Sequence, residues 1–276
     1  MKKNKKILIT GGSGFLGGHV AEKLIKEGYY CYILDIKRPT FLKSYNNKFT
    51  FIQGNISNRK KLLNIVKKVD IVYHFAAEAD IGFSSSKVLD TIKLNLFATV
   101  ELLNICVLNK IERFIFASSI YVFSEQGGFY KTTKQSCELL IENFNEEFGL
   151  KYSILRYGSL YGIRANKFNW IYKVIDKISR NEEIIRESNG YEKRRYINVE
   201  DAARASLEIL KKRYENKHIL LTGNREMTIR SLLKKIINMS GKKIRIKYLN
   251  KKNLKNHYHT SPYTFKPRVG KKMLIK

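Results

Sequence analysis

The sequence predicts an α/β protein with a doubly wound parallel sheet, followed by a smaller C-terminal α/β lobe. Short apolar runs alternate with segments of helical periodicity five times between residues 7 and 117, which implies right-handed crossovers and a sheet covered on both faces. The first apolar run, Ile7–Ile9, is followed by glycines at 11, 12 and 14 and then directly by a helical segment over 15–27, which carries two more at 17 and 18. The second, Tyr30–Asp35, ends in an acid.

Beyond Gly162 the pattern loosens, with no internal repeat or low-complexity linker. We therefore expect a main domain over 1–162 and a lobe over 163–276 that packs on it. The expected strands are 7–9, 30–35, 49–53, 70–77, 111–117 and 152–156, with 218–221 and 244–248 in the second part. The expected helices are 15–27, 57–67 with Ser57 as cap, 87–109, 130–147, 170–178, 199–212 and 228–239.

The order of strand, glycine turn and helix indicates a pyrophosphate site. Gly11 permits a tight turn, Gly14 lets backbone N–H groups approach phosphates, and Gly17 allows the helix to pack close to the strand. The phosphates would lie at the positive end of a helix dipole. Asp35 follows about twenty residues after the glycines, which is the sequence position from which a carboxylate accepts both hydroxyls of an adenosine ribose. Turn and acid together predict a Rossmann-type dinucleotide-binding domain, whereas the turn alone is also compatible with a tight loop between packed elements.

Composition limits the compartment and the partners. The 276 residues carry a formal net charge of +29, which suggests either an anionic partner such as nucleic acid or a compositional bias in an enzyme for a charged nucleotide. Because the lysines are scattered along the chain, we expect no specific nucleic-acid partner. Cys31, Cys106 and Cys137 lie in apolar or helical segments, as buried thiols of a reducing compartment do. The apolar run near the start is three residues long and no stretch is expected to span a bilayer, so the sequence predicts a cytoplasmic protein without a membrane partner.

Further motifs follow in order along the chain. The chain carries Thr10–Gly17, Asp35, His74–Ala77, Asn95, Ala117–Ser119, Tyr130 with Lys134 four residues later, Glu138, Arg156–Gly158, Tyr161–Gly162 and Arg194–Asp201. In this set the chain resembles, over nearly its whole length, the extended short-chain dehydrogenase/reductase family. Within that family it is similar to the NAD-dependent nucleotide-sugar epimerases and dehydratases, such as UDP-glucose 4-epimerase-like proteins.

The resemblance implies a cofactor, a substrate and a set of site residues. It implies NAD, with NADP less favoured, a nucleotide-sugar substrate, a homodimer, no metal, and a place in carbohydrate metabolism such as cell-surface polysaccharide synthesis. The implied catalytic residues are Ser119, Tyr130 and Lys134. The implied cofactor contacts are Gly11, Gly12, Ser13, Gly14, Phe15, Leu16, Gly17, Asp35, Asn55, Ile56, Phe75, Ala76, Ala77, Asn95, Tyr130 and Lys134. The implied substrate contacts are Ser119, Tyr157, Ser159 and Arg194, with Arg195 as the alternative to Arg194 for the phosphates.

The chemistry of these side chains agrees with that assignment. Tyr130 and Lys134 are four residues apart and share one helix face, so we expect the ammonium group to lower the pKa of the phenol and make it usable as a base. Lys134 would also bond the nicotinamide ribose. Ser119 ends the fifth strand, at the sheet edge where ligands bind in such folds, and can hold the reacting sugar oxygen. The alternatives are a tyrosine that packs the helix and a serine that caps the strand end.

Departures from the family pattern narrow the reaction. Ile120 and Tyr121 stand where the family's dehydratases carry an acid pair, so elimination of water is disfavoured. The sequence therefore predicts a 4-epimerase that oxidises carbon 4 of the sugar transiently. Two alternatives remain: an NAD(P)-dependent keto-sugar reductase or dehydrogenase, favoured by Lys37 and Arg38, and a non-catalytic relative that binds nucleic acid.

Other departures concern the pocket. Only ten residues separate Ser119 from Tyr130, which predicts a shortened loop and a more open pocket. Asn55 replaces the family's usual aspartate near adenine, Ser159 an asparagine, and Asn198 a histidine. The segment 257–276 resembles the family's closing segment but ends before its final helix.

Overall fold

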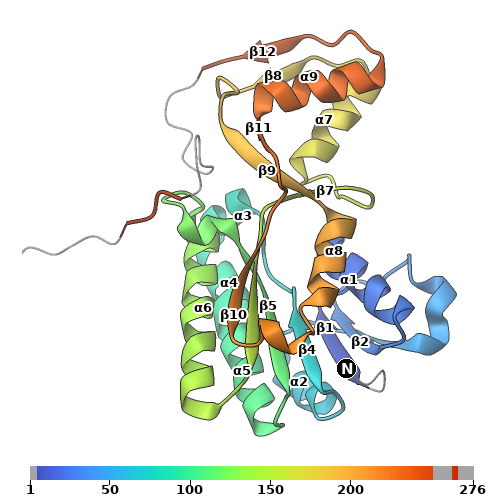
Figure 1. Cartoon of the computed structure of the whole chain (residues 1–276), viewed down its shortest axis with the longest axis vertical. Coiled ribbons are helices and arrows are strands. Elements are labelled where there is room, and N and C mark those ends of the chain that lie inside the picture. Colours follow the sequence, from blue (N-terminus) through green and yellow to red (C-terminus); the bar gives the residue numbers. More distant parts are fainter. Residues whose placement is uncertain (1–4, 251–262, 267–276) are drawn as a thin grey trace, which may run out of the picture.

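The large sheet has seven strands in the order β10-β6-β5-β4-β1-β2-β3 (Figure 1). The protein is described here by a computed structural model that covers residues 5–250 and 263–266. The strands are β1 (Lys6–Thr10), β2 (Tyr30–Asp35), β3 (Phe49–Gln53), β4 (Ile71–His74), β5 (Arg113–Ser119), β6 (Tyr152–Tyr157) and β10 (Lys217–Leu221). Every pairing among them is parallel, so the predicted doubly wound α/β fold is confirmed. The order reverses between β1 and β4, which places a ligand site at their carboxyl ends.

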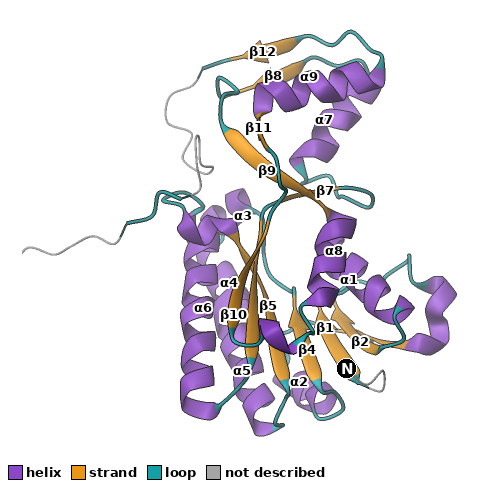
Figure 2. Ribbon diagram, viewed as in Figure 1, coloured by secondary structure: helices purple, strands orange, loops and turns teal. Residues whose placement is uncertain are grey.

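Helices cover both faces of this sheet (Figure 2). On one face α1 (Phe15–Lys26) and α8 (Val199–Glu208) form an apolar core with β1 and β2, in which Leu24, Ile33 and Ala202 are fully buried. On the other face α2 (Arg59–Val66), α5 (Ala98–Leu108) and α6 (Gly128–Phe148) bury Leu62 and Ile141 against β4 and β5. Shorter helical segments are η1 (Lys43–Lys48), α3 (Ile81–Ser86), α4 (Val88–Ile92), η2 (Lys93–Phe97), η3 (Ile120–Phe123) and η4 (Lys212–Tyr214).

The helices expected over 57–67 and 87–109 differ in detail from the observed ones. The helix expected over 57–67 begins at Arg59, because Asn58 and not Ser57 is the N-cap: the Asn58 side chain accepts a hydrogen bond from the Lys61 N–H at 3.0 Å. The helix expected over 87–109 is α4, η2 and α5 in succession, and η2 is a π-helical turn. Such turns are frequent at functional sites, and this one carries the buried Asn95.

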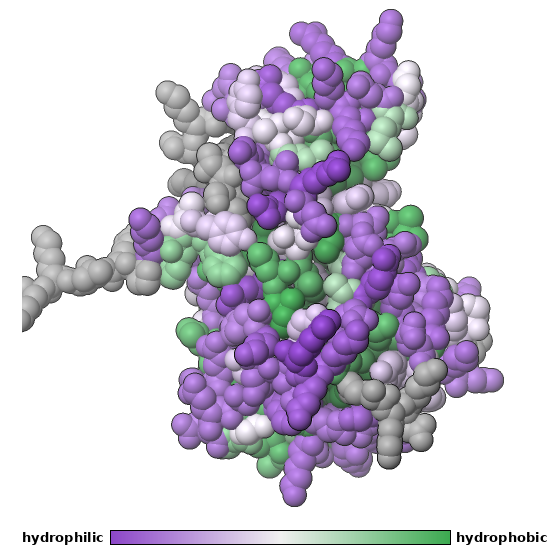
Figure 3. Space-filling model, viewed as in Figure 1, coloured by the Kyte–Doolittle hydropathy of each residue, from purple (hydrophilic) through white to green (hydrophobic). Residues whose placement is uncertain are grey.

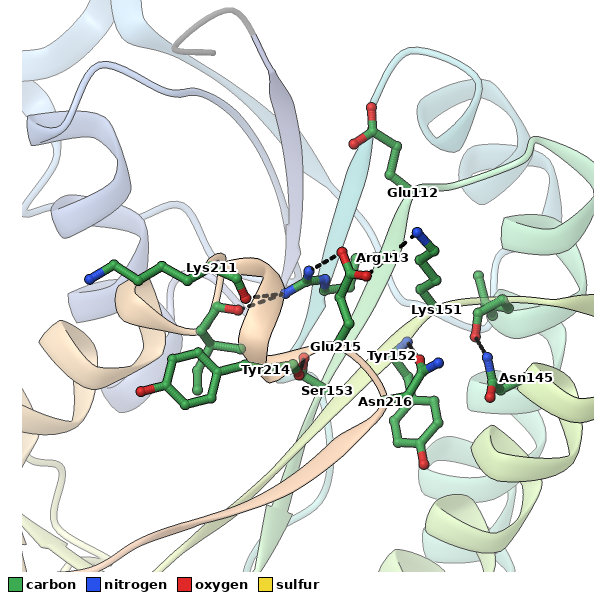
Figure 4. Close-up of polar contacts among 12 residues, drawn as sticks. Glu112, Arg113, Asn145, Lys151, Tyr152, Ser153, Lys211, Tyr214, Glu215 and Asn216 are labelled. Carbon is green, nitrogen blue, oxygen red and sulfur yellow. Dashed lines mark hydrogen bonds and ion pairs between the residues drawn. The ribbon is translucent and has the colours of Figure 1, made fainter. Parts of the chain in front are cut away.

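Arg113 anchors the connection between α8 and the last strand of the large sheet, β10 (Figure 4). The Arg113 side chain is buried at the start of β5, and its guanidinium donates to the carbonyl oxygens of Ile209 at 2.7 Å and Lys211 at 3.3 Å. It also pairs with Glu215. The helix expected over 199–212 ends at Glu208, and β10 then pairs with β6.

A smaller lobe lies at one end of the sheet (Figure 1). It comprises a sheet of order β11-β9-β7, a two-stranded β12-β8 ladder and two helices around their own apolar core. Their bounds are β7 (Ser159–Tyr161), α7 (Trp170–Ser179), β8 (Ile184–Arg186), β9 (Lys193–Asn198), β11 (Glu226–Thr228), α9 (Ile229–Ser240) and β12 (Ile246–Tyr248). The boundary expected after residue 162 does not separate the two parts in space, because α8 and β10 belong to the large sheet. Of the closing segment 257–276, only 263–266 lie within the described residues.

The segment Val88–Leu108 corrects another expectation. Among the described residues it is one helix that is long and apolar enough, by length and composition, to cross a membrane, with a mean hydropathy of 1.5 over its most apolar window. The expectation that no stretch has this property is therefore wrong. The helix nevertheless packs on the large sheet, where Leu102, Leu103 and Cys106 are fully buried, as the core helix of a globular domain does.

Candidate active site

The glycine turn after β1 has no room for side chains. Gly11 has a φ of +69°, and a Cβ there would lie 2.7 Å from the backbone nitrogen of Ala76. A Cβ on Gly17 would lie 2.3 Å from the carbonyl oxygen of Gly11. The carboxyl end of β4 and the start of α1 therefore both approach the turn at backbone distance, as the sequence predicts.

The start of α1 has the properties of an anion site. Gly14 is its N-cap and provides no side-chain hydrogen bond, and no acidic residue stands in the first turn. The Ser13 hydroxyl is buried and has no hydrogen-bond partner among the described residues. Free helix N–H groups together with a buried hydroxyl suit the oxygens of a phosphate. The turn thus fits the pyrophosphate of a dinucleotide.

Asp35 ends β2 beside this turn. Its Oδ2 accepts a hydrogen bond from the Ser13 N–H at 3.0 Å, and its Oδ1 accepts one from the Lys37 N–H at 3.1 Å. The carboxylate is half-buried, while the side chains of Lys37 and Arg38 are exposed. An acid at this place accepts ribose hydroxyls and repels a 2′-phosphate.

A cavity of about 310 Å³ opens between the end of β3 and the helices α3 to η2. It is lined by Asn55, Ser57, Glu78, Phe83, Asp90, Lys93 and Leu94. The Asn55 Oδ1 already accepts the Ser57 N–H at 2.9 Å, so its amide N–H groups remain for a ligand. Ile56 is buried in the core and does not line this cavity.

A buried network joins the end of β1 to the helix α5. The His74 ring bonds the Thr10 hydroxyl through Nδ1 at 2.6 Å and the Thr99 hydroxyl through Nε2 at 2.9 Å. Burial lowers the pKa of His74 to about 3, with a smaller effect from Lys134, so this imidazole is neutral and has a structural role. Phe75 and Ala76 follow it under the glycine turn, with the Phe75 N–H donating to the Thr10 carbonyl oxygen at 3.0 Å.

Ser119, Tyr130 and Lys134 lie together at the carboxyl edge of the large sheet. Ser119 ends β5, and its hydroxyl is hydrogen-bonded to that of Tyr130. Tyr130 and Lys134 stand on α6. The Lys134 Nζ lies 5.9 Å from the centre of the Tyr130 ring and donates to the carbonyl oxygen of Ala117 at 2.7 Å. The three predicted catalytic residues are thus brought to one place.

Their protonation differs from the expectation. Burial raises the pKa of Tyr130 to about 12, and the hydrogen bond with Ser119 only partly offsets this. Burial lowers the pKa of Lys134 to about 8. The expectation that Lys134 lowers the pKa of the phenol is wrong for this structure, because desolvation dominates and the ammonium group is engaged with Ala117.

Asn95 connects the site to its surroundings. Its Oδ1 accepts the Glu78 N–H at 2.7 Å, and its Nδ2 donates to the Glu78 carbonyl oxygen at 3.0 Å and to the Thr133 hydroxyl at 3.3 Å. The Thr133 hydroxyl in turn donates to the carbonyl oxygen of Tyr130 at 2.9 Å. Asn95 therefore holds the segment after β4 against the helix that carries the tyrosine and the lysine.

The predicted substrate residues are distributed unevenly. Arg194 is buried in β9 and donates to the Lys193 carbonyl oxygen at 3.0 Å, whereas Arg195 is exposed and lies near Glu226. The period of two along the strand thus turns Arg194 inward. Ser159 is half-buried in β7. The Tyr157 hydroxyl bonds the Ser206 hydroxyl at 2.6 Å in the core under α8, although Tyr157 pairs with Ser119 in the register of β5 and β6.

Sequence reasoning missed one feature of the site. The residues Tyr263–Lys266 lie against the loop between Ser119 and Tyr130, with the N–H groups of Thr264 and Phe265 both 2.8 Å from the carbonyl oxygen of Phe123. No local pattern signals a contact between segments about 140 residues apart.

Hydrophobic surface gathers where the lobe meets the large sheet (Figure 3). No group of three His, Cys, Asp or Glu side chains suited to a metal occurs in residues 5–250 and 263–266.

The fold and the site define a Rossmann-type dinucleotide-binding protein of the extended short-chain dehydrogenase/reductase kind. A sequence model of the NAD dependent epimerase/dehydratase family matches residues 7–223. The chain belongs to this family. The family is NAD-dependent, and the glycine turn, the free Ser13 hydroxyl and Asp35 fit NAD as the cofactor.

Relatives of two reaction types are similar to the chain. The dTDP-D-glucose 4,6-dehydratase of Mus musculus is 26% identical over 258 residues, which cover 85% of this chain and 73% of that protein. The structure of a UDP-glucose 4-epimerase from Thermotoga maritima with UDP-glucose is 27% identical, with a TM-score of 0.80 over 91% of this chain and 88% of the other. A UDP-N-acetylglucosamine 4-epimerase from Methanobrevibacter ruminantium, solved with UDP-N-acetylmuramic acid, is 28% identical, with a TM-score of 0.83 over 97% and 94% of the two chains.

Proposed function

We propose that the protein is an NAD-dependent 4-epimerase of a nucleotide-diphosphate sugar. The observation that carries this proposal is the hydroxyl pair of Ser119 and Tyr130 next to Lys134, at the sheet edge beside the glycine turn. The neighbouring positions 120 and 121 are isoleucine and tyrosine, which lack the carboxyl groups that elimination of water needs. The likeness to UDP-sugar 4-epimerases of known structure supports the same reaction.

The residues have distinct tasks in this reaction. Tyr130 takes the proton from the hydroxyl at carbon 4, and Ser119 bonds the same oxygen. Lys134 supports the phenolate and bonds the nicotinamide ribose. Arg194, with its buried guanidinium, receives the diphosphate of the substrate. When bound in the glycine cradle, NAD supplies the acceptor for the hydride at carbon 4.

The test is turnover of a panel of UDP- and dTDP-sugars, with product analysis for inversion at carbon 4. The Tyr130→Phe variant keeps the ring and removes the base, so we expect a loss of turnover of about a hundredfold or more. NAD and the nucleotide sugar should bind nearly as tightly as before. In heavy water the inverted carbon should keep its original hydrogen. Near-normal turnover of Tyr130→Phe, or solvent deuterium at the inverted carbon, would contradict the proposal.

We also propose that the enzyme is a homodimer, paired through the helices α4 to α6. Only 44% of the apolar window in Val88–Leu108 is buried, and Leu89, Phe97 and Leu139 are exposed on the outer helices. A second copy would cover this surface. Sedimentation should give a dimer for the native chain and a monomer for Phe97→Glu. A native monomer would refute the assignment.

The free thiols of Cys31, Cys106 and Cys137 support a cytoplasmic location.

A further inference from the structure

The C-terminal strap, Tyr263–Lys266, is fastened to the catalytic loop, residues 120–129. Besides the two N–H groups that face the carbonyl oxygen of Phe123, the Thr264 hydroxyl accepts the Glu125 N–H at 3.0 Å. The Lys131 Nζ lies 5.3 Å from the centre of the Phe265 ring. Backbone bonds, a side-chain bond and a cation–π contact therefore all join the strap to this loop and to the first turn of α6.

Phe123 is held on two sides. The Tyr263 ring lies 5.2 Å from its centre, and the Arg156 guanidinium lies 4.6 Å from it. Arg156 donates to both carboxylate oxygens of Glu138, at 2.6 Å for the shortest bond. Glu138 is buried and accepts the hydroxyl of Ser118, the neighbour of the catalytic serine. A row of contacts thus runs from the strap through Phe123 to the end of β5.

The loop needs such support because it is short and because the junction between the loop and α6 has few stabilising features. Two successive glycines, Gly127 and Gly128, have φ values of +105° and +50°, and α6 begins without a side-chain cap. From the helix side, the Gln135 amide donates to the carbonyl oxygen of Val122 at 2.7 Å. The loop connects Ser119 to Tyr130, whose hydroxyls are hydrogen-bonded.

We propose that the strap, acting through Phe123, is a positioning element for catalysis: it closes the shortened catalytic loop and keeps the Ser119 hydroxyl on that of Tyr130. Phe123 and Tyr263 are then positioning residues, since they act through the loop and not on the reacting atoms. The strap is distant in sequence from the catalytic loop and packs against it, where a longer loop would provide these contacts with its own residues. This inference rests on the proposed function, because Ser119 and Tyr130 are the pair that it aligns.

The test compares Tyr263→Ala with Tyr263→Phe, which keeps the ring, and with Lys266→Ala, an exposed side chain of the same strap. For Tyr263→Ala we expect kcat to fall about tenfold with KM changed less than about threefold, as for a misplaced catalytic group. Because the Ser119 bond lowers the pKa of Tyr130, its loss should move the acid limb of the kcat profile to higher pH. Tyr263→Phe and Lys266→Ala should behave as the native enzyme.

Hydrogen exchange of residues 120–129 provides a readout that does not depend on activity. Exchange there should accelerate at least about fivefold in Tyr263→Ala and stay unchanged in the other two variants. Phe123→Leu should reproduce Tyr263→Ala, and the double variant should be no worse than either single one. Unchanged kcat, pH profile and exchange in Tyr263→Ala would overturn the inference while leaving the epimerase intact. An active Tyr130→Phe would instead overturn the proposed function.

Discussion

Replacement of Gly17 by alanine probes the cofactor turn with one methyl group. The added Cβ would lie 2.3 Å from the Gly11 carbonyl oxygen, whereas ordinary contact begins at 3.4 Å, so the turn must retreat by about 1 Å. Gly11 cannot absorb this movement freely, because it already lies at backbone distance from Ala76. The same carbonyl oxygen accepts the Gly14 N–H at 3.0 Å, and that bond would be broken.

The expected cost follows from these two effects. Overpacking costs about 1–3 kcal/mol, and a lost hydrogen bond costs about 1 kcal/mol. Since about 1.4 kcal/mol corresponds to a factor of ten in affinity, a cost of about 2–4 kcal/mol in the bound geometry should weaken NAD binding by at least about tenfold. Calorimetric titration with NAD measures this directly, and circular dichroism shows whether the variant is folded.

Gly82→Ala is the matched control. Its Cβ would meet only the Asp80 carboxylate at 3.2 Å, on α3 and away from the turn. Alanine within a helix stabilises by up to about 1 kcal/mol over glycine, so NAD affinity should be unchanged. A folded Gly17→Ala variant that binds NAD as the native chain does would refute the assignment of this turn to the pyrophosphate.

Three further predictions test the charges of the site and of the fold. Lys134 has a pKa of about 8 and supports the phenolate only when protonated, so turnover should fall above about pH 8. If Lys134→Arg retains activity, this alkaline limb of its pH profile should lie at higher pH. The same alkaline limb in both enzymes would exclude Lys134 as its source. Asp35→Ser removes the charge that repels a 2′-phosphate, so the Kd ratio of NADP to NAD should fall at least about tenfold, and an unchanged ratio would contradict the role of Asp35. Burial alone would raise the pKa of Glu215, but the Arg113 guanidinium holds this pKa below its usual value. The charged Glu215 side chain therefore stabilises the fold at pH values above its unfolded-state pKa of about 4.3. This stabilisation is lost as the pH falls through the lower pKa of the folded state. Urea unfolding should therefore show Glu215→Gln less stable by about 1–3 kcal/mol at pH 7, with a difference that shrinks as the pH falls below the unfolded-state pKa. A difference that stays constant as the pH falls would exclude the ion pair as the cause.

The large sheet could be predicted from sequence because its signals are local. Buried parallel strands give continuous apolar runs, and the glycines and Asp35 mark the turn at fixed spacing. The lobe is harder to predict, since β7 and β11 have only three residues each and both pair with β9 from other parts of the chain. Gly223 shows the constraint: a Cβ there would lie 2.0 Å from the Tyr196 carbonyl oxygen. The sequence around Gly223 does not indicate that a glycine is needed there, because the need arises from a contact with a residue distant in sequence.

The candidate site divides in the same way. The spacing of four between Tyr130 and Lys134 predicts a shared helix face, and the structure has it. Tyr157 shows the opposite case: position along a strand predicts a residue near the sheet edge, but the direction of its hydroxyl depends on Ser206 in α8. The support of the catalytic loop by Tyr263 is likewise a contact between distant segments. Such contacts depend on packing and have no local signal.

The protonation of Tyr130 is the point where the structure changes the mechanistic argument most. A pKa of about 12 leaves the phenol protonated near pH 7, so its charged form needs further stabilisation before the group acts as a base. Ser119 already bonds the hydroxyl, so its contribution is included in that value. Lys134 is the remaining cation on the same helix face, and its Nζ is held by the Ala117 carbonyl oxygen. Support of the phenolate by Lys134, as in the proposed function, therefore requires the ammonium group to move from the Ala117 carbonyl oxygen toward the phenol.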